Sequence, residues 1–313
     1  MTYSITTWQG GAIQAAAIRP DMFDSFLKYV DAKPQTVEAY RRALRPFFSY
    51  LAKFEISKPT RADLIAYRDG LKEKARLAAA TVNLYITAMR RFFAWTEQEG
   101  IYPDIARGLK GADVADRFMR DDLKQDELAQ VLQAVDRDSV TGRRDYAIFR
   151  LMATAGLRTI EITRANIEDM TMKGGFMILY LQRKGRDDRA EYVKLGRSTE
   201  EAIREYLEAR PEADGKDPLF ASESDRNKGG RMTTKSISRI AKNGLKAAGF
   251  NSRRLTAHSF RHTAATIALN NGYSIGQIGE VLGHRSEGIT KRYLHSSNRE
   301  KNNMEITLDG LIG

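Results

Sequence analysis

Residues 258–293 read HSFRHTAATIALNNGYSIGQIGEVLGHRSEGITKRY, and this stretch concentrates the chemically capable side chains of the chain. A His-x-x-Arg pair, His258 and Arg261, lies at its start. Leu-Gly-His284 follows, and Tyr293 lies nine residues beyond that histidine. The apolar spacing predicts three helices, at about 259–271, at about 275–282 and from near Ser286. The stretch therefore predicts helix ends that bring histidine, arginine and tyrosine together.

Two more candidate groups lie upstream of this stretch. Arg158 follows a glycine break, and Glu161 lies three residues later, within one helical turn. Two short strands are predicted at about 176–182 and 190–195, and the polar turn RKGRDDR between them is typical of a β-hairpin tip. Lys184 lies in this turn. Helical periodicity surrounds the strands, from Leu128 to Ala155 and at about 198–209 and 234–248.

The first third of the chain is predicted to be helical throughout. Four segments with helical spacing begin near Asp21, Pro34, Thr60 and Thr81. Thr60 suits an N-cap, and Gly100 ends the fourth segment. Pro46 lies inside the second segment, so we expect a kink or break there. Phe48 and Phe93 lie on apolar faces and are expected in the core. The pattern predicts a mostly α chain (α+β), a helical bundle before a mixed unit with a small antiparallel sheet.

Composition limits what such a chain can do. The 313 residues include 51 Lys and Arg against 40 Asp and Glu, a net charge of +11, so an anionic partner is expected. The absence of cysteine excludes disulfides, thiol nucleophiles and cysteine-based metal sites, and four histidines do not suggest a metal cluster, so we predict no metal and no cofactor. We find no long apolar run and no secretory signal. We therefore expect a cytoplasmic protein without a membrane partner.

The ordered set of residues resembles the signature of the tyrosine recombinase, or phage-integrase-like, family, over residues 22–295. That signature is an Arg, a hairpin Lys, a His-x-x-Arg, a His or Trp after Leu-Gly and a Tyr about nine residues later, and each member is present in order. The segment ATVNLYITAMRRFFAW also resembles the last helix of the family's core-binding domain. The resemblance implies these catalytic residues: Arg158, Lys184, His258, Arg261, His284 and the nucleophile Tyr293, with Glu161 in support.

The chemistry of these residue types fits phosphodiester cleavage without a metal. A tyrosine phenol has an unperturbed pKa near 10 and must lose its proton during attack, which His258 can assist. Arg158 and Arg261 offer planar forks for two phosphate oxygens. Lys184 can protonate the leaving 5′-oxygen, and His284 can donate to a phosphate oxygen. A covalent intermediate keeps the energy of the broken bond, so rejoining needs no ATP.

Single residues of the set also have structural interpretations. Arg158 can simply pair with Glu161. Lys184 lies among several arginines, so the acid can be misassigned by one or two positions. His262 is interpreted as structural, and His295 is given no role.

The resemblance also implies domains and partners. We predict a tail or extra helix at 1–20, a core DNA-binding domain at 21–106, a linker at 107–122, a catalytic domain at 123–300 and a C-terminal tail at 301–313. The short first segment leaves no room for the arm-site-binding domain of some integrases.

The expected partners are double-stranded DNA with specific sites, three further subunits in a homotetramer and accessory proteins. The tail is predicted to dock on a neighbouring subunit. Predicted DNA contacts are Arg41, Arg42, Arg45, Asn83, Arg90 and Arg91.

The favoured function is that of a mobile-element recombinase working through a 3′-phosphotyrosyl intermediate and a Holliday junction. Xer-type resolution of chromosome dimers is the first alternative. A type IB topoisomerase would share the catalytic chemistry but relax supercoils as a monomer. A DNA-binding protein without catalysis, or a basic structural protein, would form no covalent complex with DNA.

Overall fold

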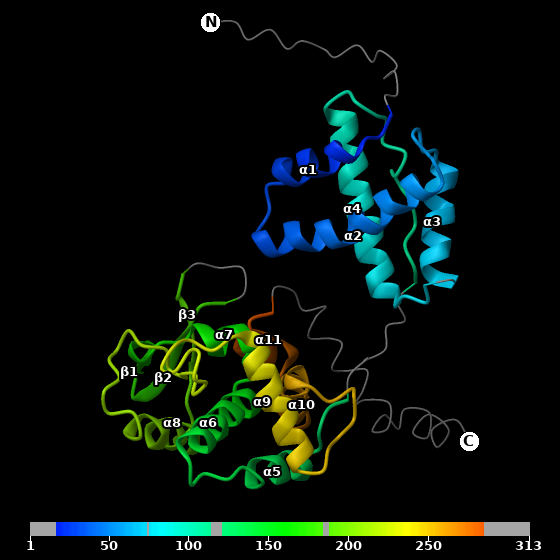
Figure 1. Cartoon of the computed structure of the whole chain (residues 1–313). Coiled ribbons are helices and arrows are strands. Elements are labelled where there is room, and N and C mark those ends of the chain that lie inside the picture. Colours follow the sequence, from blue (N-terminus) through cyan, green and yellow to red (C-terminus); the bar gives the residue numbers. More distant parts are fainter. Residues whose placement is uncertain (1–16, 74, 114–120, 184–187, 285–313) are drawn as a thin grey trace, which may run out of the picture. The chain divides into compact units, whose positions relative to one another are not determined.

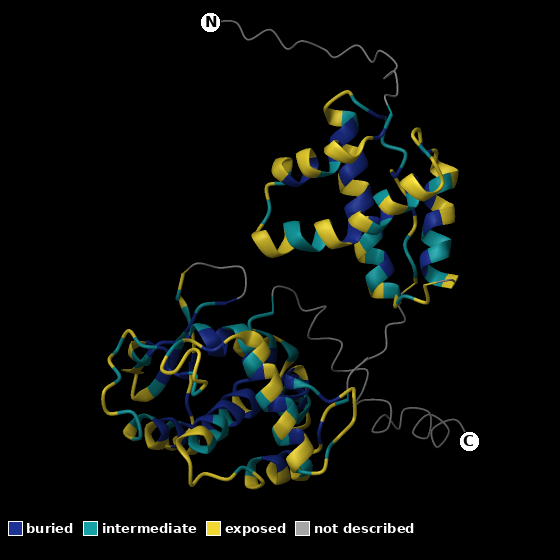
Figure 2. Cartoon of the chain, in the orientation of Figure 1, coloured by how far each residue is buried: buried dark blue, intermediate teal, exposed yellow. Residues whose placement is uncertain are grey.

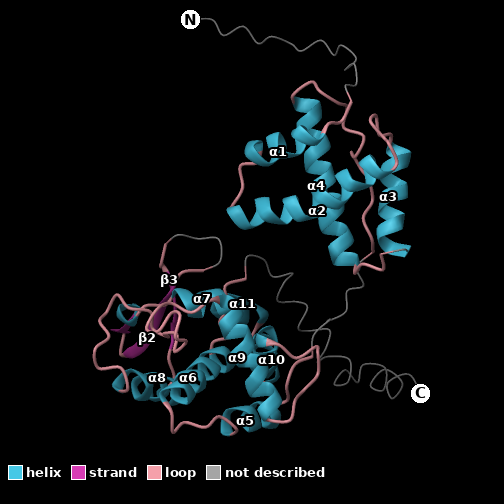
Figure 3. Ribbon diagram, in the orientation of Figure 1, coloured by secondary structure: helices cyan, strands magenta, loops and turns pink. Residues whose placement is uncertain are grey.

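The computed structural model describes residues 17–73, 75–113, 121–183 and 188–284 (Figure 1). The chain forms two compact units, residues 1–116 and 117–313, which we describe one at a time. The division falls inside the predicted linker at 107–122. The mostly α architecture with one small antiparallel sheet is confirmed (Figure 3). None of the helices in the described ranges is long and apolar enough to cross a membrane.

The first unit is a bundle of four helices, α1 (Pro20–Tyr29), α2 (Pro34–Lys53), α3 (Arg61–Glu73) and α4 (Ala79–Gln98). Proline begins both α1 and α2, where its missing N–H costs nothing. Thr60 caps α3, because its hydroxyl accepts from the Asp63 backbone N–H at 3.4 Å; the hydroxyl and the backbone N–H of Thr60 both donate to the Asp63 carboxylate at 2.7 Å. Aromatic rings fill the core. The ring centroids of Phe48 and Phe92 lie 5.3 Å apart, and Phe93 is fully buried. The predicted core role of Phe48 and Phe93 is confirmed.

Of the kink or break predicted at Pro46, the break does not occur. The helix continues from Pro34 to Lys53 through the proline. Proline removes one backbone donor, the one that would have reached the carbonyl of Arg42. Arg42 is exposed, so water can satisfy that carbonyl at little cost. Burial of Leu44 and Phe47 on the opposite side of α2 holds the helix together across the lost bond.

The chain after α4 folds back onto the first unit. Asn83 clamps it, because its amide donates to the Ala112 carbonyl at 2.9 Å and accepts from the Ala112 N–H at 2.7 Å. Arg90 donates to the carbonyl of Leu109, whose side chain is 1% exposed. The first residues of the predicted linker therefore pack as part of the helical unit.

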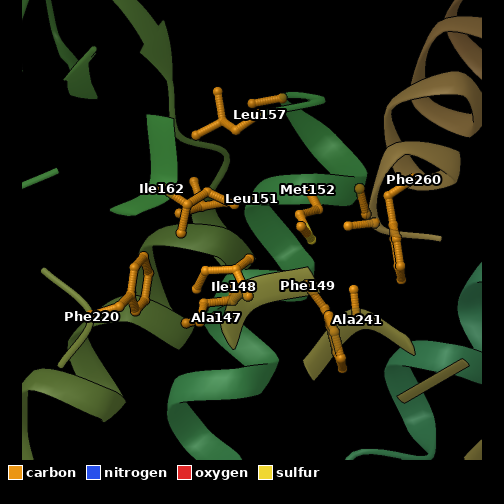
Figure 4. Packing of buried hydrophobic residues seen from close by; sticks show 14 of the residues in the cluster. Ala147, Ile148, Phe149, Leu151, Met152, Leu157, Ile162, Phe220, Ala241 and Phe260 are labelled. Carbon is orange, nitrogen blue, oxygen red and sulfur yellow. The ribbon is translucent and has the colours of Figure 1, made fainter. Parts of the chain in front are cut away.

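The second unit is built around α6 (Val140–Thr154), which has buried residues along most of its length (Figure 2). Other helices surround it: α5 (Gln125–Gln133), α8 (Arg197–Glu208), α9 (Thr234–Ala247) and α10 (Ala257–Asn270). Phe149 of α6 stacks on Phe260 of α10 with ring centroids 5.6 Å apart, and Ala241 of α9 lies beside them (Figure 4). This core fixes the start of α10, where the His-x-x-Arg pair lies.

A three-stranded antiparallel sheet lies at one end of the second unit (Figure 1). Its order is β1 (Met170–Lys173), β2 (Phe176–Leu181) and β3 (Glu191–Lys194), and it follows the short helices α7 (Thr159–Arg164) and η1 (Ile167–Asp169). The hairpin of β2 and β3 was predicted, but β1 was not. Its alternation of apolar and polar residues spans only four positions, three of them exposed, so the sequence signal there is weak.

Candidate active site

Arg158 lies at the N-terminus of α7, where Glu161 holds it twice. One carboxylate oxygen of Glu161 accepts from the Arg158 backbone N–H at 2.8 Å, and the other accepts from the guanidinium at 2.8 Å. Glu161 is fully buried, while the Arg158 side chain keeps 25% exposure. The predicted pair exists, and its geometry leaves the arginine open to an incoming anion while the buried acid fixes its orientation.

Arg261 projects from α10 into the interior and is 1% exposed. Its guanidinium donates to the Gly156 carbonyl at 2.7 Å and to the Leu282 carbonyl at 2.5 Å. These contacts join the end of α6 to the end of α11 (Ile275–Leu282). Arg261 therefore places its positive charge at the end of α11 from the protein interior, whereas Arg158 places its charge there from the partly exposed side.

The C-terminal turn of α11 is where the cations meet. The Leu282 carbonyl accepts from Arg261, from Arg183 at 3.1 Å and from Arg158 at 3.4 Å, and Arg158 also reaches the Gly283 carbonyl at 3.4 Å. The last carbonyls of a helix lack intrahelical donors and carry partial negative charge, which attracts guanidinium groups. Sequence segments more than 100 residues apart are joined at this point, where Arg158, just before α7, reaches the end of α11.

Two glycines make this close packing possible. Gly283 ends α11 in the left-handed conformation, with φ 63°, and an added Cβ would lie 2.6 Å from the Arg183 guanidinium carbon. Gly156 also has positive φ, and a Cβ there would lie 2.4 Å from a Leu282 methyl group. The glycines before Arg158 and before His284 therefore serve both backbone conformation and arginine packing.

His284 follows this turn and is neutral in the DNA-free protein. Burial, together with the positive charges of Arg261, Arg158 and Arg183 and the nearby His258, lowers its pKa to about 3. A neutral imidazole still carries one N–H donor. The ring can therefore donate to a phosphate oxygen throughout the neutral pH range.

His258 lies exposed at the start of α10, one turn before His262. Its backbone N–H donates to the capping hydroxyl of Thr256 at 3.3 Å. The rings of His258 and His262 meet edge to face with centroids 4.9 Å apart. His262 is half-buried and orients the neighbouring ring, which agrees with its interpretation as structural.

The predicted site is thus brought together in part. Arg158, Glu161, Arg261 and His284 converge on the end of α11, and the His284 environment includes His258. Lys184, Tyr293 and the C-terminal tail lie outside the described residues. Across 17–73, 75–113, 121–183 and 188–284, no three histidine, aspartate or glutamate side chains are grouped so that they could hold a metal ion.

Sequence reasoning missed Arg183. It is 5% exposed and donates to the Val281 carbonyl at 2.9 Å as well as to Leu282. The sequence offered one weak signal, an arginine at the end of an apolar strand where burial is not expected. Nothing in the sequence identified its partners, because they lie about 100 residues away.

The predicted DNA contacts divide into two groups. Arg41 and Arg42 lie exposed on α2 and share Glu38 at 3.4 and 3.0 Å, while Arg45 and Arg91 are also exposed. Asn83 and Arg90 are engaged with the backbone at Ala112 and Leu109, as described above. Arg90 is exposed as well, but its guanidinium is engaged, so the stronger predictions for contacts to DNA are Arg41, Arg42, Arg45 and Arg91.

Arginines and a neutral histidine around one helix end form a site that suits a phosphate group. The model described as "Phage integrase family" matches residues 121–300, and that described as "Phage integrase, N-terminal SAM-like domain" matches residues 21–100. The chain belongs to the phage integrase family, the tyrosine recombinases, and is a site-specific DNA recombinase.

Relatives and solved structures agree with this assignment. The chain is 29% identical to tyrosine recombinase XerC of Thermodesulfovibrio yellowstonii over 83% of this chain and 85% of the relative. Its fold is similar to that of XerH recombinase in a post-cleavage complex with difH, at TM-score 0.74, 19% identity and coverage of 91% and 83%. A lambda integrase tetramer bound to a Holliday junction also matches, at TM-score 0.65, 18% identity and coverage of 87% and 76%.

Proposed function

We propose that this recombinase cuts DNA by attack of the Tyr293 phenol on a backbone phosphate. The Tyr293 oxygen–phosphorus bond forms while the bond from phosphorus to the 5′-oxygen breaks, leaving a 3′-phosphotyrosyl link. His258 assists loss of the phenol proton, and Lys184 protonates the leaving 5′-oxygen. Reversal by a 5′-hydroxyl from another duplex restores the phosphodiester with no net hydrolysis.

The observation that carries this proposal is the convergence of Arg158, Arg261 and neutral His284 on the end of α11. The phosphorane-like transition state carries more charge on its non-bridging oxygens than the ground state does. Guanidinium groups fixed before the reaction stabilise that charge without reorganising, and each such donor is worth several kcal/mol in comparable sites. The arginines are held by buried acceptors, so they are preorganised in this sense.

The proposed partner is double-stranded DNA carrying specific recombination sites, bound by four copies of the chain. The net charge of +11 and the exposed arginines of α2 support DNA binding. The lambda integrase tetramer on a Holliday junction supports the assembly, since the two chains share a fold. We propose that accessory proteins take part and that the protein works on DNA in the cytoplasm.

Movement of a mobile element is the biological role that we favour, and the match to the phage integrase family supports it. The similarity to XerC supports a second candidate, resolution of chromosome dimers. The two roles are distinguished by the DNA sites. A chromosome carrying one recombination site in its replication terminus supports resolution, whereas sites that flank the gene for this protein support mobility.

A trapping experiment tests the mechanism. Bound duplexes are selected from a randomised pool, and the preferred site is rebuilt with a nick just downstream of the cut, so that the released fragment diffuses away. Wild-type protein with EDTA should give a covalent band on denaturing electrophoresis, and Tyr293→Phe should give none while it retains DNA affinity. A covalent band from Tyr293→Phe would refute the assignment. Relaxation of supercoiled DNA without a specific site would favour a type IB topoisomerase.

A further inference from the structure

Arg183 contacts several groups of the candidate active site, although the sequence indicated no catalytic role for it. It lies two residues after β2 ends and is 5% exposed. Its Nε donates to Glu191 of β3 at 2.9 Å, and its other nitrogens donate to the Val281 and Leu282 carbonyls of α11. A guanidinium with these partners does not face an incoming phosphate. It joins the sheet to the end of α11.

The contacts of Arg183 overlap with those of both catalytic arginines. It shares the Leu282 carbonyl with Arg158 and Arg261, and its NH1 lies 3.6 Å from the Glu161 oxygen that holds Arg158. Its guanidinium also occupies the space beside Gly283 that a side chain would need. The Arg183 guanidinium thus packs against the turn that immediately precedes His284.

We infer that Arg183 is a positioning residue for DNA cleavage, because it fixes the C-terminal turn of α11 and so aligns His284 and Arg158 for the phosphate. The inference rests on the proposed function. Lysine cannot replace this arrangement, because an ammonium group is a point charge without the fork that reaches two carbonyls and a carboxylate together. Glu191 anchors the opposite end of the fork, so movement of the turn requires that this ion pair break as well.

Arg189 provides the matched control. It belongs to the same hairpin, and it donates to the buried Asp169 at 2.5 Å and to the Arg164 carbonyl at 3.4 Å. These partners lie in η1 and at the end of α7, not in α11. Arg189→Met therefore removes an arginine ion pair near the sheet without touching the turn that precedes His284.

The test compares Arg183→Met, Arg183→Lys and Arg189→Met on the nicked substrate. At saturating DNA, we expect Arg183→Met to form covalent complex about tenfold to a hundredfold more slowly than wild type, as removal of a group that orients a ligand does elsewhere. Arg183→Lys should recover part of the rate, and Arg189→Met should remain within about threefold. DNA affinity should stay within about twofold for all three. We expect the cleavage rate to fall while DNA affinity is kept, because the proposed role of Arg183 is to align the site and not to contact DNA.

Histidine NMR on the DNA-free proteins gives a readout that loss of stability alone would not move. Arg183→Met should raise the pKa of His284 because one of the cations that lower it is gone, while Arg189→Met should leave it near the wild-type value. A wild-type cleavage rate in Arg183→Met, equal slowing in Arg189→Met, or a DNA affinity that falls as far as the rate would each overturn the inference. If wild type itself forms no covalent complex, the proposed function fails, and the NMR comparison then tests only whether the charge of Arg183 acts on His284.

Discussion

His284 should make the second unit less stable as the pH falls from 7 to 5. In the unfolded chain, a histidine has a pKa near 6.5 and takes up a proton over this range. In the folded protein, burial and the surrounding arginines lower the pKa of His284 to about 3, so its ring stays neutral. The unfolded state therefore binds more protons than the folded state between about pH 6.5 and 3. Linkage then requires that stability rise with pH across that window.

The magnitude follows from the two pKa values. At pH 5 the unfolded histidine is almost fully protonated, which stabilises the unfolded state by about 1.4 logarithmic units more than at pH 7. At 1.36 kcal/mol per unit, the free energy of unfolding falls by about 2 kcal/mol from this residue alone. The result barely changes if the folded pKa is 4 rather than 3, because both values lie below the range tested.

The assay is urea unfolding of wild type and His284→Gln at pH 7 and pH 5. Both tryptophans, Trp8 and Trp95, belong to the first unit, so their fluorescence does not report on the second. All four histidines belong to the second unit, and their ring NMR signals follow its unfolding directly. The pH-dependent loss should be about 2 kcal/mol smaller in His284→Gln than in wild type. Equal losses, or a His284 titration midpoint above 6 in the folded protein, would refute the reasoning.

Three further perturbations follow from the contacts. Gly283→Ala should destabilise the second unit by at least ~1 kcal/mol, from the left-handed backbone and the clash with Arg183, and slow cleavage; wild-type thermal stability would contradict this. Asn83→Ala should destabilise the first unit by about 1–2 kcal/mol, measured by Trp95 fluorescence in urea, because it leaves Ala112 without two hydrogen bonds. Arg45→Ala should weaken DNA binding and flatten its salt dependence without lowering stability; unchanged affinity at several salt concentrations would remove Arg45 from the interface.

The sequence predicted most of the second unit because its signals there are local. Apolar periodicity marks α10 and α11, and the polar turn between two apolar runs marks the hairpin of β2 and β3. The strand β1 escaped prediction because its side chains are mostly exposed. A kink or break at Pro46 was predicted from the proline alone, whereas burial of neighbouring residues in the core keeps the helix continuous there.

The meeting of three arginines at the end of α11 could not be predicted from local sequence patterns. The sequence indicates that Arg158, Arg261 and His284 are chemically capable. It does not reveal that the backbone carbonyl of Leu282 accepts hydrogen bonds from Arg158, Arg261 and Arg183. A carbonyl carries no sequence signature, since every residue has one. Three cations around one helix end would repel each other if the helix carbonyls and the carboxylates of Glu161 and Glu191 did not offset part of their charge. Burial and the remaining positive charge together lower the pKa of His284 and keep it neutral. The same charge should attract the scissile phosphate, so the packing that stabilises the fold also prepares the site for its substrate.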